Sequence, residues 1–210
     1  MRIHAKIVIV VLFSIVGIGN SMNAKETESP DYLKYVDEII DGFVKDMKKK
    51  YNLNCYGSGG SMPTDVEKVN VLFTFYRKST VDDARKMEVN AVQDLLQRIN
   101  THAKIRPYLR EYPFGTDRVG VTISFRTKTD GHPLDGSVAL VFLVKNKICY
   151  HTAEMRMSDP INSISLDKNN KPITKIIPGE LEEELVPLME ESYEEALKIV
   201  GILPSPNQKD

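Results

Sequence analysis

The chain has 210 residues, with 28 Lys and Arg, 29 Asp and Glu, two Cys and no Trp. Its 27% of charged and 41% of hydrophobic residues exclude an intrinsically disordered acidic chain and a protein with many membrane spans. Two cysteines are too few for a disulfide scaffold, and a formal charge of -1 gives no electrostatic reason to expect nucleic acid as a partner.

The N-terminal segment has the three zones of a secretory signal peptide. Basic residues precede an apolar run at positions 7–19, and a short polar segment continues to Ala24. The run is shorter than the roughly 20 residues that a helix needs to span a bilayer. We therefore predict that residues 1–24 direct export to the periplasm, the cell envelope or the exterior, with cleavage after Ser21 or Ala24. The alternative is an uncleaved anchor, which would place the protein at a membrane.

Cleavage changes the charge balance. Residues 1–24 contain Arg2 and Lys6 and no acidic residue, so 186 residues remain, with 26 basic and 29 acidic side chains and a formal charge of -3. This length is enough for one hydrophobic core without metals or several disulfides. We expect a single domain over residues 25–203 and a flexible C-terminal tail at 204–210.

The hydrophobic pattern changes period several times along the domain. Apolar residues at helical spacing predict amphipathic helices, and alternation predicts strands joined by short turns. The Gly-rich stretch 57–61 is interpreted as the connection between the first two strands. The last predicted helix contains Pro187 as a kink and stops at Gly201. The predicted elements are a helix at 31–50, strands at 53–55 and 69–76, a helix at 80–100, strands at 119–125, 138–144 and 148–155, a weaker hairpin at 164–166 and 173–177, and a helix at 180–200.

Strands in adjacent groups with short turns indicate an antiparallel sheet. We therefore predict an α+β fold, a two-layer sandwich in which a largely antiparallel sheet of about five strands carries helices packed on one face.

Four separated segments resemble one protein family: CYGSGGSMP at 55–63, DDARKMEVNAVQDLLQRIN at 82–100, IRPYLREYPF at 105–114 and ESYEEALKIV at 191–200. The family comprises small exported or lipid-anchored proteins of unassigned function from bacteria that live inside eukaryotic cells. The resemblance covers residues 53–200 and implies a bacterial envelope or secreted protein. It implies no catalytic residue, because the family has no established activity.

The Gly-rich stretch and the cysteines are the candidates for chemistry. A phosphate loop would need a lysine and a helix after the glycines, and here Met62 and Pro63 follow. Ser58 or Cys55 could act as a nucleophile only with a base such as His102, His132 or His151, and no spacing brings one to them. Cys55 and Cys149 are either joined by a disulfide, which export would allow, or are two buried free thiols.

The sequence gives no reason to expect a cofactor or a metal ion. Asp130, His132 and Asp135 have suitable atoms but no recognised spacing, so a solvated hairpin loop is the simpler interpretation. His151 and Glu154 are three apart on a predicted strand and therefore point to opposite faces.

The loop at 105–114 has the composition of a recognition surface, because arginine and tyrosine alternate on a segment held between two elements. The alternative is that its aromatic residues plug the core while its arginines pair with the acidic last helix, whose glutamates are interpreted as a solvated face. The candidate binding residues are Arg106, Tyr108, Arg110, Tyr112 and Phe114.

These observations favour an exported binding or interaction protein that is not an enzyme, with another protein or a peptide bound at residues 105–114 and no nucleic acid. The competing hypothesis is a hydrolase or thiol enzyme that uses Cys55 or Ser58 with a histidine base.

Overall fold

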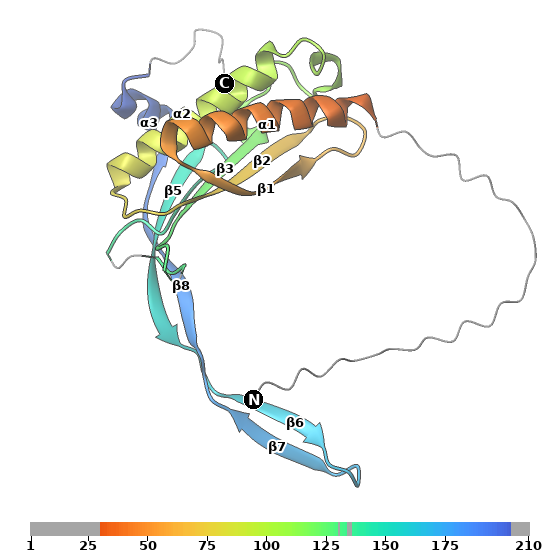
Figure 1. Cartoon of the computed structure of the whole chain (residues 1–210), viewed down its shortest axis with the longest axis vertical. Coiled ribbons are helices and arrows are strands. Elements are labelled where there is room, and N and C mark those ends of the chain that lie inside the picture. Colours follow the sequence, from red (N-terminus) through yellow and green to blue (C-terminus); the bar gives the residue numbers. More distant parts are fainter. Residues whose placement is uncertain (1–29, 130, 134–135, 203–210) are drawn as a thin grey trace, which may run out of the picture.

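A computed structural model describes residues 30–129, 131–133 and 136–202. The predicted signal peptide, the C-terminal tail, Asp130 and Asp135 lie outside the described residues. The elements form an α+β fold with a six-stranded mixed sheet, helices on one of its faces and a separate two-stranded sheet (Figure 1). The fold class predicted from the sequence is therefore confirmed. No helix in the described part of the chain is long and apolar enough to cross a membrane.

Two long helices cover the sheet. α1 (Asp31–Tyr51) ends at Asn52, which has a left-handed backbone, and α2 (Val81–Thr101) begins after Thr80, whose hydroxyl accepts a hydrogen bond from the Asp83 amide. Their apolar stripes face the strands, as in the edge-to-face contact of Phe43 in α1 with Phe73 in β2 (Lys68–Phe75), where the ring centroids are 5.6 Å apart. Helix burial against one sheet face is thus the main source of the core.

The sheet order is β1-β2-β3-β4-β5-β8. β2 and β3 (Val119–Phe125) are parallel, because α2 and the loop after it form the crossover between them, and all other neighbours are antiparallel. The remaining strands are β1 (Asn54–Ser61), β4 (Leu140–Val144), β5 (Lys147–Met157) and β8 (Leu181–Ser192).

Two assignments made from the sequence are wrong. Residues 57–61 are not a connection but belong to the edge strand β1, where a Cβ on Gly60 would lie 1.9 Å from the Lys68 carbonyl oxygen. The last helix is only α3 (Tyr193–Val200), and residues 181–192 form β8. Pro187 is tolerated there because β8 is an edge strand and its pairing with β5 is irregular next to this residue.

A two-stranded arm leaves the body of the protein (Figure 1). β4 pairs with β5 only as far as His151, so from Thr152 onward β5 pairs with β8 alone. Beyond a short junction, β6 (Ile161–Leu166) and β7 (Pro172–Ile177) continue as the hairpin predicted around Asn170. We call residues 152–186 the arm, residues 160–177 its tip, and residues 152–159 and 178–186 its stem.

Candidate functional site

The loop predicted to bind a partner is held to the body at both ends. At its C-terminal end Phe114 is 1% exposed, and its backbone amide donates to the Asn100 side chain at 2.7 Å. At its start, the ring of Tyr108 packs 5.7 Å from that of Tyr32 and 6.3 Å from that of Tyr35. Phe114 therefore belongs to the core, and Tyr108 joins the loop to α1.

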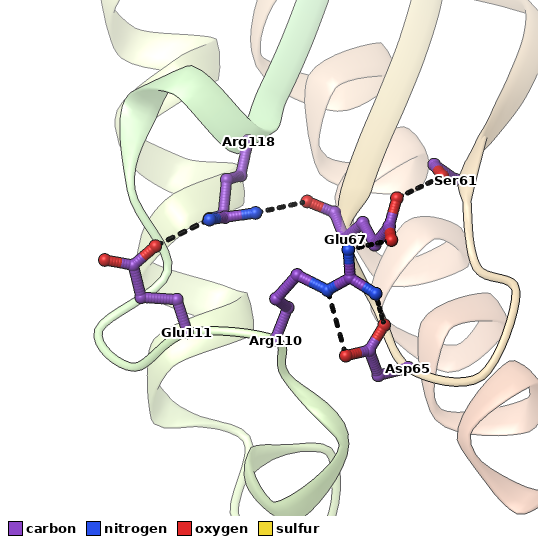
Figure 2. Close-up of polar contacts among 6 residues, drawn as sticks. All are labelled: Ser61, Asp65, Glu67, Arg110, Glu111 and Arg118. Atoms are coloured by element: carbon purple, nitrogen blue, oxygen red, sulfur yellow. Dashed lines mark hydrogen bonds and ion pairs between the residues drawn. The ribbon is translucent and has the colours of Figure 1, made fainter.

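The arginines of this region pair with carboxylates close to β1 and β2 (Figure 2). Arg110 binds both oxygens of Asp65, at 3.1 and 2.9 Å, and also Glu67. The Glu67 carboxylate accepts a hydrogen bond from Ser61 at 2.6 Å, and Arg118 donates to Glu111 at 2.6 Å and to the Glu67 carbonyl at 3.4 Å. The predicted alternative, pairing with a last acidic helix, is thus wrong in its partner, because the carboxylates come from the β1–β2 connection and from the loop itself.

Of the predicted binding residues, Arg106, Arg110 and Tyr112 are exposed, and Arg110 is the one held by carboxylates. The Arg106 guanidinium lies 4.3 Å from the centroid of the Tyr112 ring, and Tyr112 is 50% exposed. This cation–π pair is a small surface feature. In the neighbouring network the charge of Arg110 is already compensated, and the hydrogen bond to Asp65 is the main cause that raises the pKa of Arg110.

Cys55 and Cys149 are free thiols in the structure, so the alternative of a disulfide between them is wrong. Three strands separate β1 from β5, which places their axes about 19 Å apart. Cys55 packs against the core on the helix side, with its thiol 3.4 Å from the Gly57 carbonyl, whereas Cys149 pairs with Phe142 and Glu190 in the sheet. Burial raises the pKa of the Cys149 thiol, which disfavours a nucleophilic thiolate.

No histidine is brought to Cys55 or Ser58 by the described contacts. His102 accepts from the Ile105 amide and lies near Tyr35, and His151 stacks on Phe142 with ring centroids 5.4 Å apart. His132 accepts a bond from Thr127 through its backbone, in the loop between β3 and β4. Among the described residues, no group of three or more His, Cys, Asp or Glu side chains could hold a metal ion.

Ser58 borders a groove on the sheet face opposite the helices. Its volume is about 440 Å³, and its lining includes the backbone of Gly59 and Gly60 and the side chains of Thr122 and Phe142. Lys68 is the charged residue of the lining. The groove thus offers shape and apolar contact but no pair of acid and base.

Ionisable groups are also buried between α2 and the strands. Arg85 donates to Glu191 at 2.7 Å, and the Tyr150 hydroxyl donates to the same carboxylate oxygen at 2.5 Å. Glu88 is fully buried, and neither of its carboxyl oxygens has a hydrogen-bond partner; burial raises its pKa well above the usual value, which a backbone contact with Leu143 offsets only in part. None of these groups lines the groove.

The arm presents the most extended apolar surface of the described chain. At the tip, Ile161, Ile164, Leu166 and Ile176 are 65 to 72% exposed. In the register of β6 and β7, Ile161 and Ile177 share one face, whereas Ile164 and Ile176 share the other. On the stem, one face carries Met155, Met157, Leu181 and Leu185 together with Glu183, and the opposite face carries Glu154, Arg156, Glu182 and Glu184.

Sequence reasoning found the tip hairpin but missed this surface. The signal was two short apolar runs, at 164–166 and 173–177, on either side of Asn169 and Asn170, which predicts a hairpin. This pattern does not show that the hairpin stands away from the core, because that depends on the pairing of β5 with β8, and residues 181–192 have the spacing of a helix.

Comparisons with protein-family models, with curated proteins and with solved structures find no match for this chain.

Proposed function

We propose that this chain is an exported interaction protein, not an enzyme, and that it binds a protein partner through the arm. The observation that carries this proposal is the exposure of Ile161, Ile164, Leu166 and Ile176 on a two-stranded ribbon outside the core. An isolated two-stranded hairpin is marginally stable in water, and exposed apolar clusters on monomers mark interaction sites. A partner that covers these side chains would stabilise the ribbon and bury the cluster.

The remaining surfaces support an interaction role more weakly. Arg106 and Tyr112 could add a polar contact on the body of the protein, and they remain our candidates within residues 105–114. Hydrolase or thiol chemistry at Cys55 or Ser58 has no supporting contact, because the Cys55 thiol bonds to a backbone carbonyl and no described histidine reaches either residue.

Site-specific photo-crosslinking in the cell of origin tests the role of the arm. A photoreactive residue at Ile164 should give covalent adducts of higher mass, and one at Ile199 on α3, which is also 56% exposed, should give none. Absence of adducts from Ile164 and from Ile176 would contradict the proposal. Mass spectrometry of the same exported protein checks the signal peptide, for which we expect an N-terminus at Met22 or Lys25, and an intact Met1 would contradict cleavage.

A further inference from the structure

The arm is divided into two halves of opposite charge. The tip contains Lys168, Lys171 and Lys175 against Asp167, a formal charge of +2. The stem contains five glutamates and Asp159 against Arg156, a formal charge of -5; the glutamates are residues 154, 180, 182, 183 and 184. The division falls at the junction between the two hairpin segments.

Some stem carboxylates are already paired within the chain and others are not. Glu183 binds Arg126 of the body at 2.9 Å, and Arg156 binds Glu154 and Glu184 at 2.9 and 2.8 Å. Among the described residues, Glu180 and Glu182 form no ion pair, and neither do the three tip lysines. The unpaired acidic groups of the stem and the unpaired basic groups of the tip are therefore available to another molecule.

The two halves also match in length. β6 and β7 have six residues each, and the part of the stem beyond the body has six residues in each strand, 152–157 and 181–186. Each half is thus about 20 Å long. Two arms laid antiparallel, with a two-fold axis at the junction, would place the tip of each along the whole stem of the other.

Resting on the proposed role of the arm, we infer that its partner is a second copy of this chain. In the antiparallel pair, the basic tip of one copy lies on the acidic stem of the other, twice by symmetry. The tip face that carries Ile161, Ile173 and Ile177 then covers the stem face of Met157, Leu181 and Leu185, which are 67%, 60% and 41% exposed in the single chain. Glu182 lies on the opposite face of the stem, so the tip lysines meet the stem carboxylates around the edges of the narrow ribbon. Charge sets the antiparallel direction, since parallel arms would oppose like charges, and apolar burial supplies the attraction.

Charge reversal tests this arrangement by sedimentation of the purified mature chain. The tip variant carries Lys168→Glu, Lys171→Glu and Lys175→Glu, and the stem variant carries Glu180→Lys and Glu182→Lys. Each variant alone should dimerise at least about tenfold more weakly than the unmodified chain, because its two contacts become repulsive. An equimolar mixture of the two should form a heterodimer, because there both contacts are attractive again.

A matched control reverses three exposed lysines of α1, with Lys34→Glu, Lys45→Glu and Lys49→Glu. It changes the net charge by the same amount as the tip variant and should leave the dimer intact. A mixture of tip and stem variants that stays monomeric would overturn the tip-to-stem arrangement, as would a dimer that the tip variant forms as tightly as the unmodified chain. Circular dichroism confirms that each variant is folded.

The failure of this inference can be told from the failure of the proposed function. If the purified chain is monomeric at low salt and high concentration while Ile164 still crosslinks in the cell, the partner is a different protein and the second-copy inference is overturned. If Ile164 crosslinks to nothing, the role of the arm itself is contradicted.

Discussion

Glu88 carries the least favourable polar burial among the described residues. It sits on the inner side of α2, fully buried, with no hydrogen bond to either carboxyl oxygen. Burial raises its pKa well above the value of 4.5 for an ordinary glutamate, so the folded chain holds this proton to a higher pH than the unfolded chain does. Ionisation of the group therefore adds no cost below pH 4.5, where it is protonated in both states, and this added cost grows as the pH rises from there to the raised pKa.

We expect Glu88→Gln to remove this pH dependence. At low pH the variant should match the parent chain, because both side chains are then neutral and of similar size. Above pH 4.5 the free energy of unfolding of the parent chain should fall, relative to that of the variant, by up to about 1.4 kcal/mol per pH unit until Glu88 ionises. Urea unfolding followed by circular dichroism over a pH series measures this, with the exposed Glu195→Gln as control; parallel curves for parent and Glu88→Gln would contradict the assignment.

The pair of Arg85 and Glu191 shows a different kind of burial, because here both charges are compensated. Their side chains are 8% and 5% exposed, and Tyr150 donates to the same carboxylate. The pair connects α2 to the end of β8 just before α3 begins. The position of α3 therefore depends on a contact between residues 106 positions apart in the sequence.

Glu191→Leu should destabilise the fold by about 3 kcal/mol, because it removes the buried partner of Arg85 and leaves that charge only the exposed carboxylate of Asp82. The double variant with Arg85→Met removes that charge and should recover a large part of the loss. Denaturant unfolding of the single and double variants gives the coupling. If the double variant were as unstable as the sum of the two single variants, the pair would not be the coupled unit that the geometry indicates.

At the scale of elements, the junction of the arm depends on one close backbone approach. A Cβ added to Gly179 would lie 1.8 Å from the Ser158 carbonyl oxygen. The same junction is joined by two hydrogen bonds, from the Ser158 amide to the Glu180 carbonyl at 2.8 Å and from the Glu180 amide to the Ser158 hydroxyl at 3.0 Å. Any side chain at 179 must therefore displace the backbone where the tip joins the stem.

Gly179→Ala should loosen the tip without unfolding the body. We expect faster hydrogen exchange of the β6 and β7 amides and unchanged protection in α2 and β3. Gly59→Ala is the matched control, because nothing lies within 4 Å of the added Cβ there. Equal exchange in the tips of the two variants would show that the close approach at Gly179 does not hold the junction.

The elements that the sequence predicts well are those whose signals are local. Thr80 caps α2, the short turn at Lys145 and Asn146 joins β4 to β5, and Asn170 adopts a left-handed backbone in the tip hairpin. β8 was mistaken for helix because its leucines also fit a helical spacing, and only its pairing with β5 overrides that preference. The candidate loop was predicted as a unit, but the ion pairs of Arg110 join it to residues 43 and 45 positions away, and no local spacing reveals them.

At the scale of the whole molecule, the core and the arm are separate units of stability. The hydrophobic core cluster contains residues from α1, α2, α3 and the sheet, and none of its members comes from residues 152–186. Among the described residues, Arg126 of the body and Glu183 of the stem form the ion pair that joins the arm to the body. Burial of apolar surface is the main term in folding, so the body should hold its fold whether or not the tip is present.

Excision of the tip tests this division. Residues 159–179 are replaced by Asn-Gly, so that Ser158 and Glu180, which already pair across the ribbon, are joined by a two-residue hairpin turn. We expect the free energy of unfolding of the body to change by less than about 1 kcal/mol, since no core residue is removed. The slope of the unfolding free energy against urea concentration should fall slightly, because less surface is exposed on unfolding. Self-association should be lost, because both the apolar tip and its lysines are gone. Urea unfolding measures the stability of the variant, and sedimentation of the same sample measures its self-association. If the variant without the tip were unfolded, the arm would belong to the same folding unit as the body.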